Sequence, residues 1–201
     1  MEENGINLKM PKKMEDAVNG RISDISTEIQ SKRAQIEKIK NDEKMKPSKR
    51  DKELSAINKK ISDLEYQKGL LDDFINGLHA LGQNPDITYT FNPSDDAFQT
   101  NTFQEIDGVI TINYQEHSYI GMANMVHETT HAIQDYRKQV RNNNLMFCET
   151  NAYSTQYAFS PDSFKYILNE YNPTPRISSE WVKGVYYIKE GKRVYPYKGI
   201  E

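Results

Sequence analysis

Apolar residues in the first 82 positions of the chain recur in steps of three and four. A narrow apolar seam of this period is typical of helices that pair as a coiled coil. A lysine interrupts each of two successive seams, Lys32 in the first and Lys68 in the second. We therefore predict two helices within residues 12–83, behind an N-terminal tail of residues 1–11. The seam positions are Val18, Ile22, Ile25, Ile29, Ile36 and Ile39, then Leu54, Ile57, Ile61, Leu64, Leu71, Ile75 and Leu78.

The two seams are separated by Lys46, Pro47 and Ser48. Because proline has no amide hydrogen, we predict that Pro47 ends the first helix. Two helices joined by a short turn form an antiparallel hairpin, about 40 Å long at about 1.5 Å per residue. The second helix becomes more apolar after Tyr66, so that end should pack on the following domain. The hairpin is either a solvated spacer or a surface that docks a protein partner, and its charged faces fit both.

Beyond residue 83 the pattern changes to short strands and helices, which predicts a second, α+β domain over residues 84–201. Asp107-Gly108 is a strong turn signal between two alternating segments and predicts a β-hairpin. The expected strands are residues 87–91, 101–106, 109–114, 185–188 and 193–197. The expected helices are residues 118–140, 145–159 and 162–171.

A metal-binding pattern lies in the first of these helices. His127 and His131 are four positions apart, so their side chains project from one helix face, one turn apart. Two imidazoles so placed can bind one Zn²⁺ ion. Glu128 lies beside them and could act as general base on a metal-bound water. No charged residue occurs from Tyr119 to Val126, as expected of a buried helix.

A catalytic zinc site needs a third protein ligand and an open position. Asp135 follows on the same helix, one turn beyond His131. Three ligands on one straight helix converge poorly on one ion. We therefore expect Asp135 to lie beside the site or in solvent. Glu149 lies 18 residues after His131 in the next expected helix, and a turn at residues 141–144 would bring it opposite the histidines. Cys148 is a further candidate as a soft ligand, although a small buried thiol is its simpler role.

The pattern His127-Glu128-x-x-His131, followed by Glu149-x-x-Ala152 on a second helix, resembles the gluzincin group of zinc metallopeptidases. This resemblance covers about a quarter of the chain and implies a zincin-like fold with a small sheet beside the two helices. It implies that His127, His131 and Glu149 bind Zn²⁺ and that Glu128 is the general base. Ala152 would be the small residue that lets the second helix approach the first.

The same resemblance implies roles for neighbouring residues. The strand at 109–114 would be the edge strand that binds an extended peptide by strand addition. Many gluzincins have Asp one turn after the ligand Glu, where this chain has Tyr153, so Asp135 or a backbone carbonyl is expected to orient a histidine. Tyr153 could donate a hydrogen bond to a ligand or to a transition-state oxyanion. The run from His127 to Gln134 is also similar to metallopeptidase domains of bacterial toxins and secreted effectors.

Several other side chains are weaker candidates. His117 opens the motif helix and is expected to cap it rather than to bind metal or substrate. His79 lies in the hairpin and is expected to be structural, and Trp181 should anchor the C-terminal segment in the core. Alternative oxyanion donors are Tyr157, Tyr186, Tyr187 and Arg176.

The composition narrows the function classes. The 201 residues include 26 Lys and Arg and 29 Asp and Glu, and a net charge of −3 argues against generic nucleic-acid binding. No apolar run reaches about 18 residues, so no membrane span is expected. Met1 to Pro11 has no apolar core of a signal peptide, so we expect a cytoplasmic location or secretion by a signal-peptide-independent route. A single cysteine excludes an internal disulfide.

These features predict an α+β zinc metallopeptidase that hydrolyses peptide bonds in a peptide or protein substrate, preceded by a helical hairpin. The alternative is a coiled-coil interaction protein, or an effector, whose metal site is structural or inactive. Zinc content and the coordination of the ion distinguish the two, because a catalytic site keeps one position open.

Overall fold

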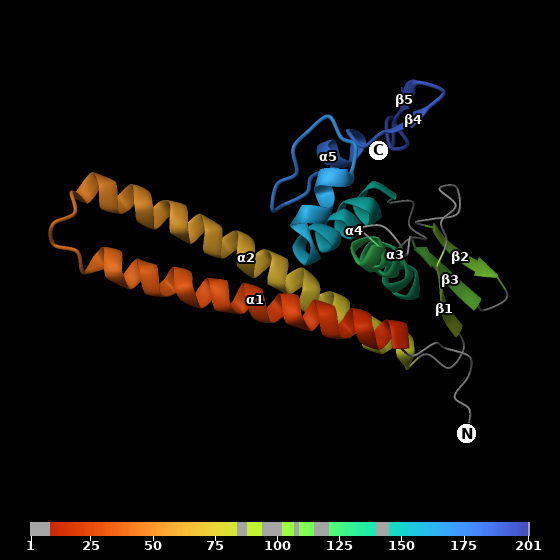
Figure 1. Cartoon of the computed structure of the whole chain (residues 1–201), viewed down its shortest axis with the longest axis horizontal. Helices are drawn as coiled ribbons and strands as arrows, with labels where there is room; N and C mark the ends of the chain where they lie inside the picture. Colours follow the sequence, from red (N-terminus) through yellow and green to blue (C-terminus); the bar gives the residue numbers. More distant parts are fainter. Residues whose placement is uncertain are drawn as a thin grey trace.

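The computed structural model describes residues 9–83, 88–93, 102–106, 109–114, 121–139 and 145–200. Within these ranges the chain is a mainly helical α+β protein with two small sheets. Two long helices form an arm that projects from the remainder of the molecule (Figure 1). None of the described helices combines the length and the apolar character that crossing a membrane requires. His117 and the turn Asp107-Gly108 lie outside the described residues.

The arm is the expected antiparallel helical hairpin. Helix α1 spans Lys9–Lys40 and helix α2 spans Pro47–Gly82. Pro47 does not end α1, contrary to expectation, because α1 already ends at Lys40 and Pro47 is in the first turn of α2. Proline suits that position, since an amide hydrogen there would have no acceptor within the helix. The 36 residues of α2 make the hairpin about 54 Å long, longer than the expected 40 Å or so.

Two further helices lie beside the hairpin. Helix α3 spans Gly121–Tyr136, and helix α4 spans Leu145–Phe159, which are the bounds predicted for it. A short 3₁₀ helix, η2, covers Pro161–Tyr166 in place of the longer helix expected at residues 162–171. It ends because the following residue, Ile167, has an extended backbone.

The C-terminal segment adds one unpredicted helix and a small hairpin. Helix α5 spans Ser179–Lys183 and contains Trp181, which is buried against the ring of Phe164. The prediction that Trp181 anchors this segment is confirmed. Strands β4, Tyr187–Lys189, and β5, Lys192–Val194, form an antiparallel pair that is shorter than predicted.

The first sheet is mixed. Its strands are β1, Thr88–Pro93, β2, Thr102–Ile106, and β3, Val109–Tyr114, in the order β1-β3-β2. Strands β2 and β3 pair antiparallel, as predicted, whereas β1 pairs parallel with β3. Strand β3 is therefore central, and the expectation that residues 109–114 form the edge strand is wrong. The second neighbour of β3 comes from a segment distant in sequence, which the local pattern cannot reveal.

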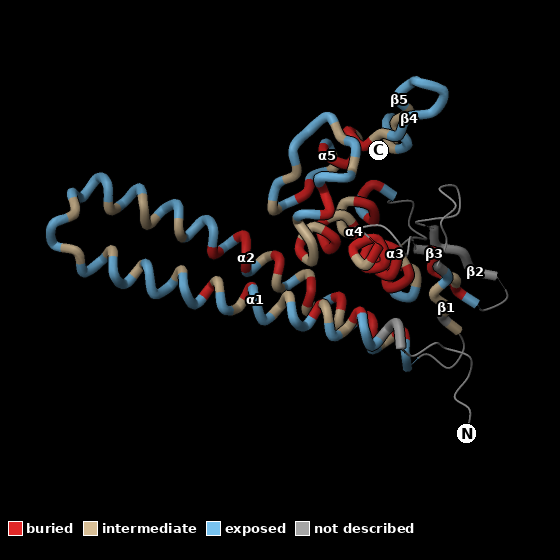
Figure 2. The backbone as a smooth tube through the Cα atoms, in the orientation of Figure 1, coloured by how far each residue is buried: buried red, intermediate tan, exposed pale blue. Residues whose placement is uncertain are grey.

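One apolar cluster joins the hairpin to the rest of the molecule. Phe74 of α2 lies in it together with Val126 and Ile133 of α3 and Ile112 of β3. A Cβ atom at Gly77 of α2 would lie 2.6 Å from the Ile133 side chain, so the close approach of the helices requires glycine there. The more apolar end of α2 thus packs as predicted, and buried residues concentrate in this half of the hairpin (Figure 2).

Candidate metal centre

Helices α3 and α4 pack against each other and carry the three residues of a compact polar cluster. The Nε2 atoms of His127 and His131 on α3 are 3.2 Å apart. The carboxylate oxygens of Glu149 on α4 lie 3.6 Å from Nε2 of His127 and 3.5 Å from Nε2 of His131. His127 and Glu149 are buried and His131 is half-buried. These three residues could hold a metal ion, and they are the ones that sequence reasoning brought together.

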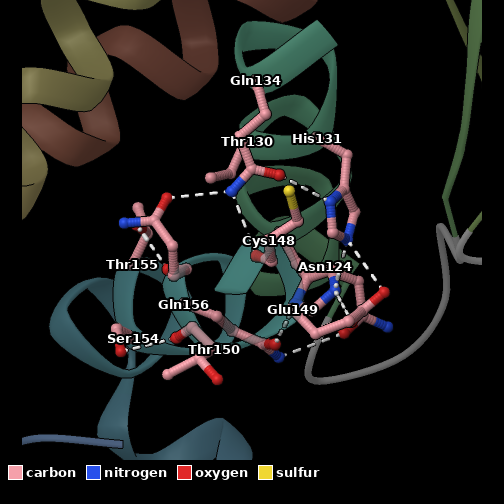
Figure 3. Close-up of polar contacts among 12 residues, drawn as sticks. Asn124, Thr130, His131, Gln134, Cys148, Glu149, Thr150, Ser154, Thr155 and Gln156 are labelled. Atoms are coloured by element: carbon pink, nitrogen blue, oxygen red, sulfur yellow. Dashed lines mark hydrogen bonds and ion pairs between the residues drawn. The ribbon is translucent and has the colours of Figure 1, made fainter. Parts of the chain in front are cut away.

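A glutamine side chain orients His131 (Figure 3). The Oε1 atom of Gln134, three residues further along α3, lies 2.9 Å from Nδ1 of His131. The amide nitrogen of Gln134 donates to the Cys148 carbonyl and to Oδ1 of Asn151, both at 3.0 Å. Because this nitrogen already donates to a carbonyl, Oε1 is the acceptor and Nδ1 of His131 carries the hydrogen. In the neutral imidazole the lone pair then lies on Nε2, which faces the cluster.

His127 has a matching partner on α4. Its Nδ1 atom lies 3.1 Å from Oε1 of Gln156. The amide nitrogen of Gln156 donates to Oδ1 of Asn124 at 3.2 Å (Figure 3). All of these side chains are buried. Two glutamines therefore orient the histidines, and Asp135, which is half-buried and outside the cluster, does not take the role expected of it.

The Glu149 carboxylate carries a buried negative charge. Burial raises its pKa, but the neighbouring His127 and His131 outweigh burial and hold the pKa far below its ordinary range. Its Oε2 atom is buried and has no hydrogen-bond partner among the described residues. An unsatisfied buried carboxylate is costly unless a cation compensates it. When the two imidazoles are neutral, their Nε2 lone pairs and the carboxylate form a set of acceptors that suits a cation.

Glu128 is buried on α3, next to the first histidine. Burial raises the pKa of its carboxyl group, and the charges of His127 and His131 oppose this shift without cancelling it. A carboxylate with a raised pKa accepts a proton near neutral pH more readily than an exposed one. This environment suits a general base.

Tyr153 lies beside the cluster. Its ring packs edge-on against His127, with 4.4 Å between centroids, and against Trp181. Burial raises its pKa, so the phenol keeps its hydrogen and can donate it. Tyr197 of the C-terminal segment packs on Tyr153, and burial, Tyr153 and Glu149 together raise the pKa of Tyr197. Sequence reasoning missed Tyr197, because no local spacing links it to the motif.

The remaining candidates do not join the cluster. Burial raises the pKa of the Cys148 thiol, which disfavours the thiolate that binds metals. His79 lies on the exposed hairpin surface, 2.9 Å from Glu15, as its structural role predicts. Tyr187 is exposed. The other alternative oxyanion donors have partners of their own: Arg176 with Asp63, Tyr157 with Phe164, and Tyr186 with Tyr195.

Comparisons of the chain with family models, with curated proteins and with solved structures find no match. The features that bear on function are the geometry of His127, His131 and Glu149 and the groups around them. This arrangement offers two nitrogens and one carboxylate to a cation, with a buried carboxyl group, Glu128, close by.

Proposed function

We propose that the chain is a zinc-dependent peptidase in which His127, His131 and Glu149 hold the ion. The observation that carries this proposal is the spacing of the ligand groups: the two Nε2 atoms are 3.2 Å apart, and each lies 3.5 or 3.6 Å from a different carboxylate oxygen of Glu149. Zinc bonds of about 2.0–2.1 Å in tetrahedral geometry separate neighbouring ligand atoms by about 3.3 Å. Two imidazoles with one carboxylate also favour zinc over magnesium or calcium, which prefer oxygen ligands.

The hydrogen bonds around the cluster support the same proposal. Each Nδ1 atom faces a glutamine oxygen, so the two Nε2 lone pairs and the Glu149 carboxylate face one another. The two imidazoles already attract the Glu149 carboxylate, and a divalent cation bound to their neutral forms would attract it more strongly. Histidines that bind zinc usually donate their other ring hydrogen to an oxygen, as they do here.

Hydrolysis assigns separate roles to the chain's own side chains. Zinc, when bound, supplies a Lewis acid that polarises a carbonyl and acidifies water. Glu128 takes the proton of the attacking water and passes it to the departing nitrogen, a task that its raised pKa favours. Tyr153 supplies a hydrogen-bond donor on the side of His127.

The substrate proposed is a peptide or protein in an extended conformation. Strand β3 cannot accept it by strand addition, because β1 and β2 occupy both of its sides. Strand β2 is at the edge of the sheet and contacts α3, so an added strand would lie along β2.

Metal content and the Glu128→Gln variant test the proposal. Protein purified without added zinc should contain about one zinc per chain, since the three ligands form one site. Glu128→Gln should lower the hydrolysis of a quenched fluorescent peptide library by about 10²–10⁴-fold, the usual contribution of a general base. Zinc stoichiometry should not change. Glu43→Gln, on the exposed hairpin turn, is the matched control and should keep full activity.

Two results would contradict the proposal. Hydrolysis retained in Glu128→Gln would remove Glu128 from its role. Zinc affinity unchanged by Glu149→Ala would remove Glu149 from the ligands and contradict the geometry of the cluster.

The alternative is an interaction protein or effector whose metal is structural, and the projecting hairpin favours this second function (Figure 1). X-ray absorption that shows four protein ligands would support the structural site, because a catalytic zinc keeps one position for water. Growth arrest on expression that Glu128→Gln relieves would instead support a toxic peptidase.

A further inference from the structure

The half of the hairpin that includes its turn, residues 30–60, differs from every other helical part of the molecule. None of its residues is buried, although the apolar seam continues through it. We call these residues the distal arm; Figure 2 shows it as exposed and partly exposed backbone far from the other elements. Its seam residues Ile36, Ile39, Leu54 and Ile57 are only half-buried. Two paired helices leave one side of such a seam open, which a third helix covers in larger coiled coils.

A groove lies between α1 and α2 in the distal arm. Its volume is about 560 Å³. The apolar side chains of Ile36 and Leu54 line it, with the buried Ile61 just beyond the arm, and so do the charged side chains of Arg33, Lys40 and Glu37. The stretch from Arg33 to Lys40 covers two helical turns, about 10 Å along α1. This length matches two or three apolar side chains spaced three and four residues apart on a third helix.

The distal arm also concentrates positive charge. It contains eleven Lys and Arg against five Asp and Glu, a net charge of +6, whereas the remainder of the chain carries −9, since the whole carries −3. Five of its lysines form no ion pair with any residue that the structure describes. These lysines are Lys32, Lys38, Lys44, Lys46 and Lys52. The distal arm is therefore strongly basic, although the net charge of the whole chain is small.

We propose that the distal arm docks an acidic amphipathic helix of another protein, which lies in the groove as the third helix of a coiled coil. The apolar face of that helix covers Ile36 and Leu54. Its carboxylates face Arg33 and Lys40, whose present ion pairs with Glu65 and Glu37 are exposed to solvent and can be shared or exchanged. The inference does not depend on the proposed peptidase activity.

Charge and shape argue against other occupants. The distal arm of a second copy would bring +6 against +6. Nucleic acid and anionic lipid headgroups would leave the apolar groove unused, because their phosphates would meet only the lysines and arginines. Among large apolar side chains the hairpin turn offers only Met45 for insertion into a membrane.

Fluorescence anisotropy on the full chain tests the proposal. The probe is a labelled helical peptide of about three heptads with leucine at the a and d positions and glutamate at e and g. It should bind at least about tenfold more tightly than the same peptide with glutamine at e and g, and binding should weaken as salt increases.

Charge reversal in the groove sharpens the test. Arg33→Glu with Lys40→Glu should weaken binding at least about tenfold, because the two new glutamates repel those of the probe. Leu54→Asp should do the same through the apolar part of the groove. Lys12→Glu with Lys13→Glu makes the same charge change on exposed positions of α1 outside the arm and should leave binding unchanged. Circular dichroism should show equal helicity in all variants, since every replaced side chain lies on the surface or in the half-buried seam.

Four outcomes would overturn the proposal. In the first, the glutamate peptide does not bind; in the second, the Arg33→Glu, Lys40→Glu variant binds it as tightly as the wild type. In the third, phosphatidylserine vesicles or duplex DNA bind more tightly than the peptide. In the fourth, the protein sediments as a dimer and the same variant dissociates that dimer. The third outcome would assign the arm to phosphate groups, and the fourth would assign it to a second copy of this chain.

Discussion

The two halves of the helical hairpin share one sequence pattern but lie in different surroundings. In the half next to the body, the seam residues Leu71 and Leu78 are 0% and 8% exposed. In the distal arm, Ile36 and Leu54 belong to the same seams and are only half-buried. Helices α3 and α4 make the difference, because they cover α2 near its C-terminal end and leave the turn end open. An apolar seam thus predicts a face for packing but not whether that face is covered.

Alanine substitutions should lower the free energy of unfolding much more in the half next to the body than in the distal arm, and this is the largest difference we expect. Phe74→Ala should lower the free energy of unfolding by about 3–5 kcal/mol, because it opens a cavity in the shared apolar cluster. Leu54→Ala should cost less than about 1.5 kcal/mol, since its half-buried side chain has few neighbours to lose. Urea denaturation followed by circular dichroism measures both. Equal losses would mean that the distal arm is as tightly packed as the rest and would remove the contrast.

Substitution of the glutamine beside His131 should have a smaller effect, and this effect should be on zinc affinity. A substitution in the distal arm should leave zinc affinity unchanged. Gln134→Leu removes the acceptor for Nδ1 of His131 and should weaken zinc binding about 10–100-fold. Gln35→Leu, an exposed position of the distal arm, is the matched control and should leave zinc binding unchanged. Competition with a chromophoric chelator measures the affinity. If Gln134→Leu binds zinc as tightly as the control, the hydrogen bond does not orient a ligand.

The smallest expected effect is a pH-dependent change in the free energy of unfolding from Asp63, which lies where the two halves of the hairpin meet. Burial raises the pKa of Asp63, but hydrogen bonds from Arg176 and Lys59 lower it more, so it lies below the ordinary value of 3.8. A carboxyl group whose pKa falls on folding stabilises the fold above its ordinary pKa, and this stabilisation disappears as pH falls through the lowered pKa.

The Asp63→Asn variant tests this linkage. It should lower the free energy of unfolding at pH 7 by less than about 1 kcal/mol, because Arg176 and Lys59 are largely in solvent. The difference from the wild type should shrink as pH decreases below about 3.8. Asp51→Asn in the distal arm should show no comparable trend. A difference that stays constant down to acidic pH would show that the Asp63 ion pairs contribute no stability.

Local signals predicted most elements of the fold. The bounds of α4 follow from its continuous helical pattern and from Pro161 directly behind it, and the Asp107-Gly108 signal correctly predicts that β2 and β3 pair antiparallel. The end of α1 was misplaced because proline is compatible with the region after one helix and with the start of the next. The central position of β3 was missed because parallel pairing joins segments that are distant in sequence.

The sequence alone determined that His127 and His131 share one helix face, because their spacing acts within a single turn. It also determined that two long helices each carry an apolar seam. Only the tertiary structure decided that Glu149 lies 3.5 Å from His131, that Gln134 and Gln156 orient the two imidazoles, and which half of the hairpin is covered. The physical reason is that these features depend on distances between elements that are remote along the chain, and packing sets such distances.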